Sequence, residues 1–224
     1  MAHVYTAMGA VTALFATLDV FGGRFRSAFL WLALATVIDT TDGWLARTLR
    51  VKERLPSFDG ARLDDIVDYL TYVFVPVLLI LEADLLPPAW GPAAGVAVLL
   101  ASAYGFSQSE AKVKAGDYFF TGFPSYWNIV ALYLYVWRLP PAAAAAILLA
   151  LAGLVFVPLR YVYPSRTETL RGLTLVLGTT WGALVFWLLW ALPAAAEPWL
   201  SLSLVFPAYY AALSIWLHFA RPTK

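Results

Sequence analysis

Long apolar segments alternate with short polar connections along almost the whole chain. A helix needs about 20 mostly apolar residues to cross a bilayer, and eight such segments can be distinguished, at roughly 4–22, 26–48, 61–83, 87–109, 124–138, 141–163, 171–192 and 198–219. Prolines stand where several segments begin, a position at which the missing N–H of proline costs no hydrogen bond: Pro87, Pro88, Pro124, Pro140, Pro141 and Pro198. The pattern predicts an all-α fold, a polytopic integral membrane helical bundle of about eight transmembrane helices in a single domain over residues 1–224.

The basic residues indicate how this bundle is oriented. An even number of spans places both termini on one side of the membrane. Twelve of the 15 Lys and Arg residues fall on that side: Arg47, Arg50, Lys52, Arg54, Arg62, Lys112, Lys114, Arg160, Arg166, Arg171, Arg221 and Lys224. The other three are Arg24, Arg26 and Arg138. Because cytoplasmic loops carry the excess of Lys and Arg, we expect both termini to be cytoplasmic.

Composition excludes several other classes of protein. Apolar residues make up 62% of the chain and charged residues 13%, against about 45–50% and about 25% in soluble domains, so the charges are too few to coat a water-facing surface. The lack of cysteine in the sequence excludes disulfides, thiolate catalysis and Cys-ligated metals. A net charge of +1 argues against a nucleic-acid partner. Residues 1–4 carry no basic n-region, so we expect no secretory signal peptide.

The acidic residues are concentrated in one short part of the chain. Seven of the 14 lie between Asp39 and Asp68, and several fall inside predicted spans, where an ionised carboxylate costs about 2.5–3.5 kcal/mol. Asp39 and Asp42 are three residues apart in the second span, so they lie on one face of its helix. Asp64 and Asp68 are four residues apart in the third span and also share a face, whereas Asp65 points elsewhere.

The two pairs are expected at the same depth in the membrane. The second span runs out to the cytoplasm and the third runs back, which places all four carboxylates within about 5–12 Å of that surface at a rise of ~1.5 Å per residue. Four negative charges that face one another in a low dielectric need cations, and carboxylate oxygens suit Mg²⁺ or Mn²⁺. We therefore interpret Asp39, Asp42, Asp64 and Asp68 as a site for two divalent metal ions.

Two other interpretations of these carboxylates are open. They can act as polar contacts between helices or pair with Arg47 and Arg62, although four carboxylates in facing pairs make this interpretation less favoured. They can also line the ion pathway of a cation transporter. Transporter sites tend towards the membrane midplane and use broken helices, whereas these residues are expected near one face beside a basic loop. An enzyme with a metal site is therefore the favoured hypothesis, and a cation transporter is the alternative.

The residues around the carboxylates form a specific motif. The run Asp39-x-x-Asp42-Gly43-x-x-Ala46-Arg47 is followed, after 12 residues, by Gly60-x-x-x-Asp64-x-x-x-Asp68. This pattern resembles the signature of the CDP-alcohol phosphotransferase family. The 12-residue gap and the later segment 117–128, with Gly122-Phe123-Pro124 and Trp127-Asn128, resemble the bacterial phosphatidylcholine synthase branch of that family. The predicted number of spans, eight, is also similar to that of this branch.

The resemblance implies which residues bind metal. Asp39, Asp42 and Asp64 would hold the first ion, and Asp39, Asp64 and Asp68 would hold the second. The cofactors would be two divalent ions per site, either Mg²⁺ or Mn²⁺. Asp68 would also be the catalytic residue, acting as general base.

The resemblance also implies which residues contact the substrate CDP-diacylglycerol: Gly43, Ala46, Arg47, Gly60 and Thr6. The small Gly and Ala side chains would leave room for the cytidine and ribose. His3 stands where many family members have Asn near the nucleotide, and we expect it to be an interfacial, solvated residue.

The activity implied by the resemblance is transfer of a phosphatidyl group from CDP-diacylglycerol to an alcohol with release of CMP. The branch implies choline as the acceptor, and serine or another amino alcohol is the alternative. The protein would be integral to the bacterial inner (cytoplasmic) membrane, with its active site facing the cytoplasm. The resemblance further suggests a homodimer.

Choline carries no proton on nitrogen, so aromatic faces and carboxylates are the groups that can recognise it. The connection between the fourth and fifth spans and the start of the fifth supply both kinds of group: Glu110, Tyr118, Phe119, Phe123, Tyr126 and Trp127. Tyr69 and Tyr72 are further candidates. An aromatic belt at the membrane interface is the alternative interpretation of these rings.

Overall fold

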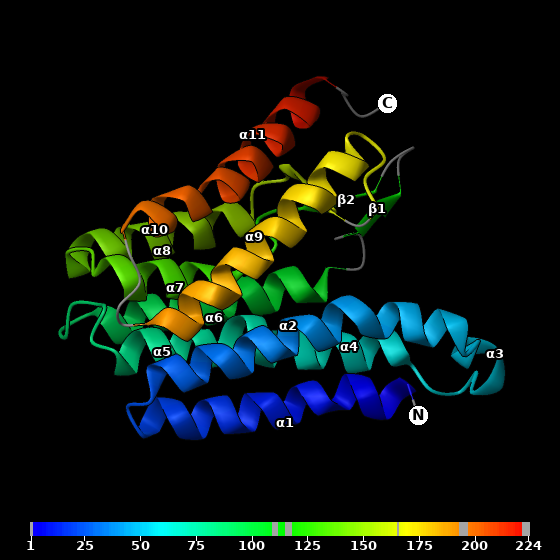
Figure 1. Cartoon of the computed structure of the whole chain (residues 1–224), viewed down its shortest axis with the longest axis horizontal. Helices are drawn as coiled ribbons and strands as arrows, with labels where there is room; N and C mark the ends of the chain where they lie inside the picture. The colour runs from blue at the N-terminus through cyan, green and yellow to red at the C-terminus, as the bar shows by residue number, and fades with distance from the viewer. Residues whose placement is uncertain (1, 109–111, 115–117, 165, 193–196, 221–224) are drawn as a thin grey trace. The chain divides into compact units, whose positions relative to one another are not determined.

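The computed structural model describes residues 2–108, 112–114, 118–164, 166–192 and 197–220, and most of these residues are helical (Figure 1). In chain order the helices are α1 (Ala2–Phe21), α2 (Phe25–Thr48), α3 (Val51–Arg54), α4 (Gly60–Asp68), the π-helix η1 (Tyr69–Phe74), α5 (Val75–Glu82), α6 (Gly91–Ser107), α7 (Trp127–Trp137), α8 (Pro141–Val155), α9 (Arg171–Ala191), α10 (Glu197–Ser203) and α11 (Val205–Ala220). The strands are β1 (Lys112–Lys114), β2 (Tyr118–Thr121) and β3 (Arg160–Val162). Each of the eight predicted segments contains helix.

The chain divides into two units. Unit 1 comprises Met1–Phe106 and Ser125–Ala150, and unit 2 comprises Ser107–Pro124 and Leu151–Lys224. Unit 1 contains α1 to α7 and most of α8, including every residue of the two carboxylate pairs. Unit 2 contains the three strands and α9 to α11.

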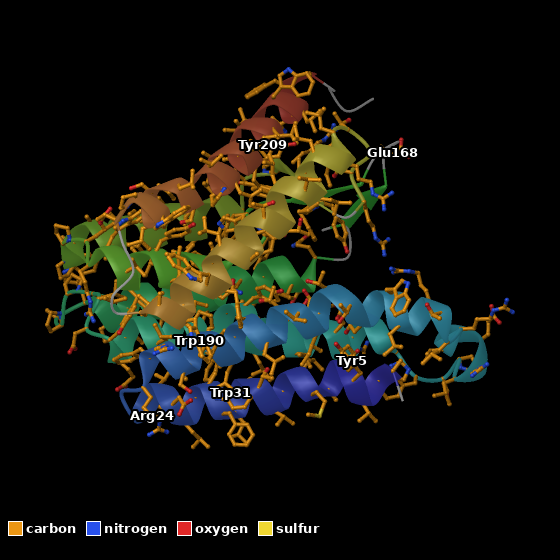
Figure 2. All side chains as sticks on the ribbon, viewed as in Figure 1. Tyr5, Arg24, Trp31, Glu168, Trp190 and Tyr209 are labelled. Carbon is orange, nitrogen blue, oxygen red and sulfur yellow. The ribbon has the colours of Figure 1, made fainter. Side chains whose placement is uncertain are left out.

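Helices α1 and α2 pack side by side in unit 1 and are joined by a tight turn (Figure 1). The buried carboxylate of Asp19 holds this turn. It accepts hydrogen bonds from Nε of Arg24 at 2.6 Å and Nε1 of Trp31 at 3.1 Å, and a third from the hydroxyl of Ser27. Figure 2 shows Arg24 and Trp31 near the turn and Tyr5 towards the other end of α1, where the chain begins. The turn therefore fixes how α1 and α2 align along their lengths.

The third predicted span is a continuous helical run made of α4, η1 and α5. Its middle part, Tyr69–Phe74, is π-helical, which the sequence pattern does not predict. Pro76 stands in the first turn of α5 and has no N–H to donate to the preceding turn, which gives a physical reason for the wider winding there. Single π-helical turns inside helices are frequent at functional sites, and this one follows Asp68 directly.

Helix α8, in the sixth predicted span, is shorter than predicted. It ends at Val155 rather than near residue 163, because Pro158 lacks an N–H and restricts the residue before it. The chain then forms β3, and the strands pair antiparallel in the order β1-β2-β3. Phe120 of β2, for example, lies opposite Tyr161 of β3. The fold is therefore nearly, and not entirely, α-helical.

The core of unit 2 joins this small sheet to α11. Val162 of β3 donates its backbone N–H to Oγ of Ser214 at 3.0 Å and accepts a hydrogen bond from the hydroxyl of Tyr210 at 3.0 Å. Phe119 of β2 and Leu217 of α11 are buried in the same cluster. The last predicted span, 198–219, forms two helices, α10 and α11, which meet at residue 204.

Apolar helices with lipid-compatible surfaces identify an integral membrane protein. Among the described residues, three segments are long and apolar enough to cross a membrane: Ala2–Phe21, Arg171–Ala191 and Glu197–Ala220. Three shorter apolar helices are Gly91–Ser107, Trp127–Trp137 and Pro141–Val155. Large apolar side chains face outwards, such as Phe219 at 75% exposed and Leu100 at 67%. Such a surface is unfavourable in water and favourable in lipid.

Candidate metal centre

Three carboxylates from two helices converge in unit 1. One carboxylate oxygen from each of Asp39 and Asp42 on α2 and Asp64 on α4 lies within 4.8 Å of the other two. The spacing of three residues places the first two side chains on one face of α2, as the sequence predicts. Asp42 is only 7% exposed, and the other two are half-buried. The structure therefore brings together three of the four residues predicted to bind metal.

Hydroxyl groups from two other elements hold two of these carboxylates. The hydroxyl of Thr6 on α1 donates to Oδ2 of Asp42 at 2.7 Å. The hydroxyl of Tyr72 in η1 donates to Oδ2 of Asp39 at 2.7 Å. Each bond uses one lone pair of its carboxylate and leaves further acceptor sites on the two oxygens. Tyr72 is therefore a partner of the carboxylates that the sequence pattern did not identify in this role.

The donor set suits a hard divalent cation. Three carboxylates at this separation repel one another in a partly buried site, and a bound cation offsets that repulsion. Oxygens that bind one Mg²⁺ at about 2.1 Å are at most about 4.2 Å apart, so small side-chain rotations bring three oxygens now within 4.8 Å of one another onto one ion. The hydrogen bonds from Thr6 and Tyr72 orient the ligands in the way that partners of metal ligands commonly do.

Asp68 lies one helical turn after Asp64, at the end of α4 where η1 begins. It is half-buried and stands four residues before Tyr72 in the same continuous helical run. Tyr72 is thus a neighbour of both Asp39 and Asp68. The roles assigned to Asp68, in a second metal site and as a general base, stay predictions.

The residues predicted to contact CDP lie around the carboxylates. On α2 the guanidinium of Arg47 lies against Gly43, since a Cβ on Gly43 would be 3.3 Å from Nη1 of Arg47. Ala46, half-buried, follows Asp42 by one turn on the same helix. Gly60 begins α4, one turn before Asp64. Like Thr6, these residues belong to unit 1, and their contacts with substrate stay predictions.

The expectation of a solvated His3 is wrong. Its ring centroid lies 4.1 Å from that of Phe58, and a Cβ on Gly60 would be 2.8 Å from its Cε1. Its Nε2 is buried and has no hydrogen-bond partner among the residues that the structure describes. The close approach to Gly60 explains the difference, because a Cβ at position 60 would crowd the imidazole where it now packs.

The residues predicted to bind choline are divided between the two units. Phe119 is buried in the core of unit 2, and the ring centroid of Phe123 lies 6.2 Å from that of Tyr161 in the same unit. Glu110 and the side chain of Tyr118 lie outside the described residues.

Tyr126 and Trp127 belong to unit 1, as do the carboxylates. Trp127 is fully buried, and its Nε1 donates to Oγ of Ser102 at 2.7 Å. The next residue, Asn128, donates through Nδ2 to Oγ1 of Thr36 on α2 at 3.4 Å. The start of α7 is thus linked to α2 one turn before Asp39.

Substitution of Thr6 tests whether the hydroxyl partners support the metal site. Thr6→Val keeps the shape of the side chain and removes the donor to Asp42. Loss of such a partner typically weakens metal binding by about 10-fold to 100-fold, and we expect a Mn²⁺ dissociation constant raised by at least about 10-fold in a calorimetric titration. Thr17→Val is the matched control, because the hydroxyl of Thr17 on the same helix donates to the backbone carbonyl of Ala13, one turn earlier. Equal Mn²⁺ affinities in the two variants would contradict the role of Thr6.

The chain also matches a known protein family. The family model for CDP-alcohol phosphatidyltransferase matches residues 1–159, which include α1, α2 and the whole run from α4 to α5. The match therefore contains all four acidic residues of the motif and their hydroxyl partners Thr6 and Tyr72.

Similar curated proteins come from several bacteria. Phosphatidylcholine synthase of Bradyrhizobium diazoefficiens is 41% identical over 182 residues, covering 81% of this chain and 67% of that protein. The enzyme of the same name from Legionella bozemanae is 48% identical over 143 residues, covering 63% of this chain and 65% of its own length. That from Pseudomonas aeruginosa is 38% identical over 179 residues, covering 80% and 74%. The chain thus spans about two thirds to three quarters of the length of these relatives.

The aspartate motif, its convergence on α2 and α4, and a family match that extends over both helices agree with one another. The chain belongs to the CDP-alcohol phosphatidyltransferase family.

Proposed function

We propose that this protein is a phosphatidylcholine synthase, which transfers the phosphatidyl group of CDP-diacylglycerol to choline and releases CMP. The observation that carries the proposal is the convergence of Asp39, Asp42 and Asp64 within 4.8 Å in a chain of this family. The names of its relatives support choline as the acceptor. Helices α2 and α4 would thus supply a metal-dependent site for a pyrophosphate.

The proposed site holds two divalent ions, Mg²⁺ or Mn²⁺. Asp39, Asp42 and Asp64 would bind the first, and Asp39, Asp64 and Asp68 the second. When bound, the ions supply positive charge that neutralises the pyrophosphate and the charge developing on the departing CMP. The hydroxyls of Thr6 and Tyr72 keep the two carboxylates of α2 oriented.

The transfer is an in-line displacement at the phosphorus that bears the diacylglycerol. The hydroxyl oxygen of choline forms a bond to this phosphorus, and the bond from the same phosphorus to the bridging oxygen breaks, so that CMP leaves. Asp68 accepts the hydroxyl proton. Arg47 and Gly60 contact the CDP portion, while Gly43 and Ala46 leave space on α2 for the nucleoside. Because a carboxylate is a weak base for an alcohol, its position beside the attacking oxygen matters as much as its basicity.

A panel of acceptor alcohols tests the proposal. Purified protein in detergent is supplied with CDP-diacylglycerol and Mn²⁺ and with choline, ethanolamine or serine in turn, and the lipid product and CMP are measured. We expect choline to be the preferred acceptor. A preference for serine or ethanolamine would replace the phosphatidylcholine synthase by the alternative phosphatidyltransferase. Uptake of choline or metal into proteoliposomes with no lipid product would favour a transporter.

The proposed topology has eight spans, cytoplasmic termini and an active site that faces the cytoplasm, in the bacterial inner membrane. The sequence has no cysteine, so single cysteines report accessibility without background labelling. Ser57→Cys, in the exposed connection between α3 and α4, should react in cells only after a reagent can reach the cytoplasm. Ala89→Cys, in the exposed connection between α5 and α6, should react with an impermeant maleimide from outside the inner membrane. The reverse pattern would contradict the orientation.

Two further predictions rest on the family resemblance and the apolar pattern. One is that the chain forms a homodimer, which the mass of the solubilised protein by light scattering would check. The other is that residues 1–224 form a single transmembrane domain; in that case both units of the structure would be parts of one domain.

A further inference from the structure

Two tyrosine rings meet beside the carboxylates of unit 1. Tyr72 comes from η1 and Tyr126 stands directly before α7. Their ring centroids are 6.2 Å apart, and the ring planes are inclined by 58°. The hydroxyl of Tyr72 donates to Asp39, and Asp68 stands four residues before Tyr72 in the same continuous helical run. Two tyrosine rings and the carboxylate of Asp39 therefore lie close together, with Asp68 one helical turn before Tyr72.

This arrangement matches the chemistry of a quaternary ammonium group. Such a group has no N–H to donate, so it is held by ring faces within about 6 Å and by negative charge. Two rings whose centroids are 6.2 Å apart are close enough for one cation to lie within about 6 Å of both. A primary ammonium group is more strongly hydrated and gains more from hydrogen-bond acceptors than from ring faces.

The position of Tyr126 is held by its neighbours. Ser125 has a φ of 56°, in the left-handed region that a non-glycine residue adopts only where its surroundings hold it. The hydroxyl of Ser125 donates to Oγ of Ser102 at 3.2 Å, and the indole of Trp127 donates to the same oxygen at 2.7 Å. Both flanking residues are buried. Trp127 thus anchors the start of α7, and Tyr126 is the residue whose ring is placed beside Tyr72.

A second aromatic pair, on α7, differs from the pair of Tyr72 and Tyr126 in the inclination of its rings. The rings of Tyr133 and Trp137 are stacked on each other, with centroids 5.1 Å apart and an inclination of 22°. Nearly parallel rings at this distance cover each other's faces and leave no angle for a cation. Tyr133 therefore serves as a control residue on the same helix.

The geometry points to the rings of Tyr72 and Tyr126 as the subsite for the trimethylammonium group of the acceptor alcohol. This inference rests on the proposed function. The hydroxyl of choline is only two carbons from its nitrogen, so a cation held at these rings keeps that hydroxyl near Asp68, the proposed base. The subsite therefore selects the acceptor and positions it for attack.

Kinetics with a ring-removing and a ring-keeping variant test this assignment. We expect Tyr126→Leu to raise the KM for choline by about 10-fold, because one of two cation–π contacts is lost. The KM for CDP-diacylglycerol should stay within about twofold of that of the unmodified protein, since Tyr126 is not among the residues proposed to contact CDP. Tyr126→Phe and the control Tyr133→Leu should leave the KM for choline unchanged, because each keeps both rings of the subsite.

Competition provides a second readout that needs no variant. Tetramethylammonium, which has the cation of choline and no hydroxyl, should inhibit the unmodified protein competitively with choline. It should lose about 10-fold in potency against Tyr126→Leu.

The subsite is overturned if Tyr126→Leu and Tyr126→Phe have the same KM for choline, or if tetramethylammonium does not compete with choline. Either outcome leaves the synthase activity of the unmodified protein intact. If the unmodified protein forms no phosphatidylcholine at any choline concentration, the proposed function itself fails. The two failures are therefore distinguishable.

Discussion

Replacing Asp39 by Ala should abolish the metal-dependent binding of CDP-diacylglycerol. Asp39 contributes one of the three oxygens that lie within 4.8 Å of one another, and it is the proposed ligand of both ions. Its loss leaves each site with too few carboxylates for a hard cation. We expect the affinity for CDP-diacylglycerol in the presence of Mn²⁺ to fall by more than about 100-fold, which exceeds the effect of removing a supporting hydrogen bond.

Titration of CDP-diacylglycerol into purified protein, with Mn²⁺ and then with EDTA, measures this effect. In the unmodified protein EDTA should weaken binding, whereas in Asp39→Ala it should make no difference. Asp65→Ala is the matched control, because it removes a half-buried carboxylate of α4 that is not among the three converging residues. Binding by Asp39→Ala that stays as strong and as sensitive to EDTA as in the control would remove Asp39 from the metal site.

Replacing Asp68 by Asn should separate binding from catalysis. Asparagine has nearly the same shape as aspartate and cannot accept the proton of the attacking hydroxyl. General-base catalysis typically contributes about 10²-fold to 10⁴-fold to a rate, so we expect the rate of phosphatidylcholine formation to fall by at least about 100-fold. Binding of CDP-diacylglycerol with Mn²⁺ should be retained, since Asp39, Asp42 and Asp64 still supply the first ion with ligands.

Initial rates and binding titrations on the same preparation measure both halves of this prediction. Asp65→Asn is the control for the amide substitution, since it makes the same change three residues earlier in α4. Retention of most of the activity by Asp68→Asn would exclude Asp68 as the base.

The convergence of the carboxylates could be predicted from spacing alone. Residues three and four apart share a helix face, and a short connection between two apolar helices makes antiparallel neighbours of α2 and the run that begins with α4. These local rules placed Asp39, Asp42 and Asp64 together, as the structure does. They required no knowledge of the rest of the bundle.

The partners of these carboxylates could not be predicted in the same way. Tyr72, which donates to Asp39, lies in the π-helical η1, whereas helical periodicity assumes regular α-helix throughout. The bond from Thr6 to Asp42 joins residues 36 positions apart in the sequence and depends on how α1 packs against α2. Such contacts are set by tertiary packing.

The small sheet was missed for a related reason. Hydropathy does not distinguish an apolar strand from the continuation of an apolar helix, so residues 156–163 were predicted as helix. Pro158 was the available signal, since it disfavours helix at and before its position. Pairing of β3 with β2 then uses the backbone groups that the helix leaves unpaired.

The aspartate site is proposed to transfer a phosphatidyl group to choline. The most direct test is to measure CMP and phosphatidylcholine together after purified protein is mixed with CDP-diacylglycerol, isotopically labelled choline and Mn²⁺. We predict equal amounts of the two products, and neither product once EDTA is added. If neither product forms with any divalent metal, or if labelled choline never enters lipid, the claim is contradicted.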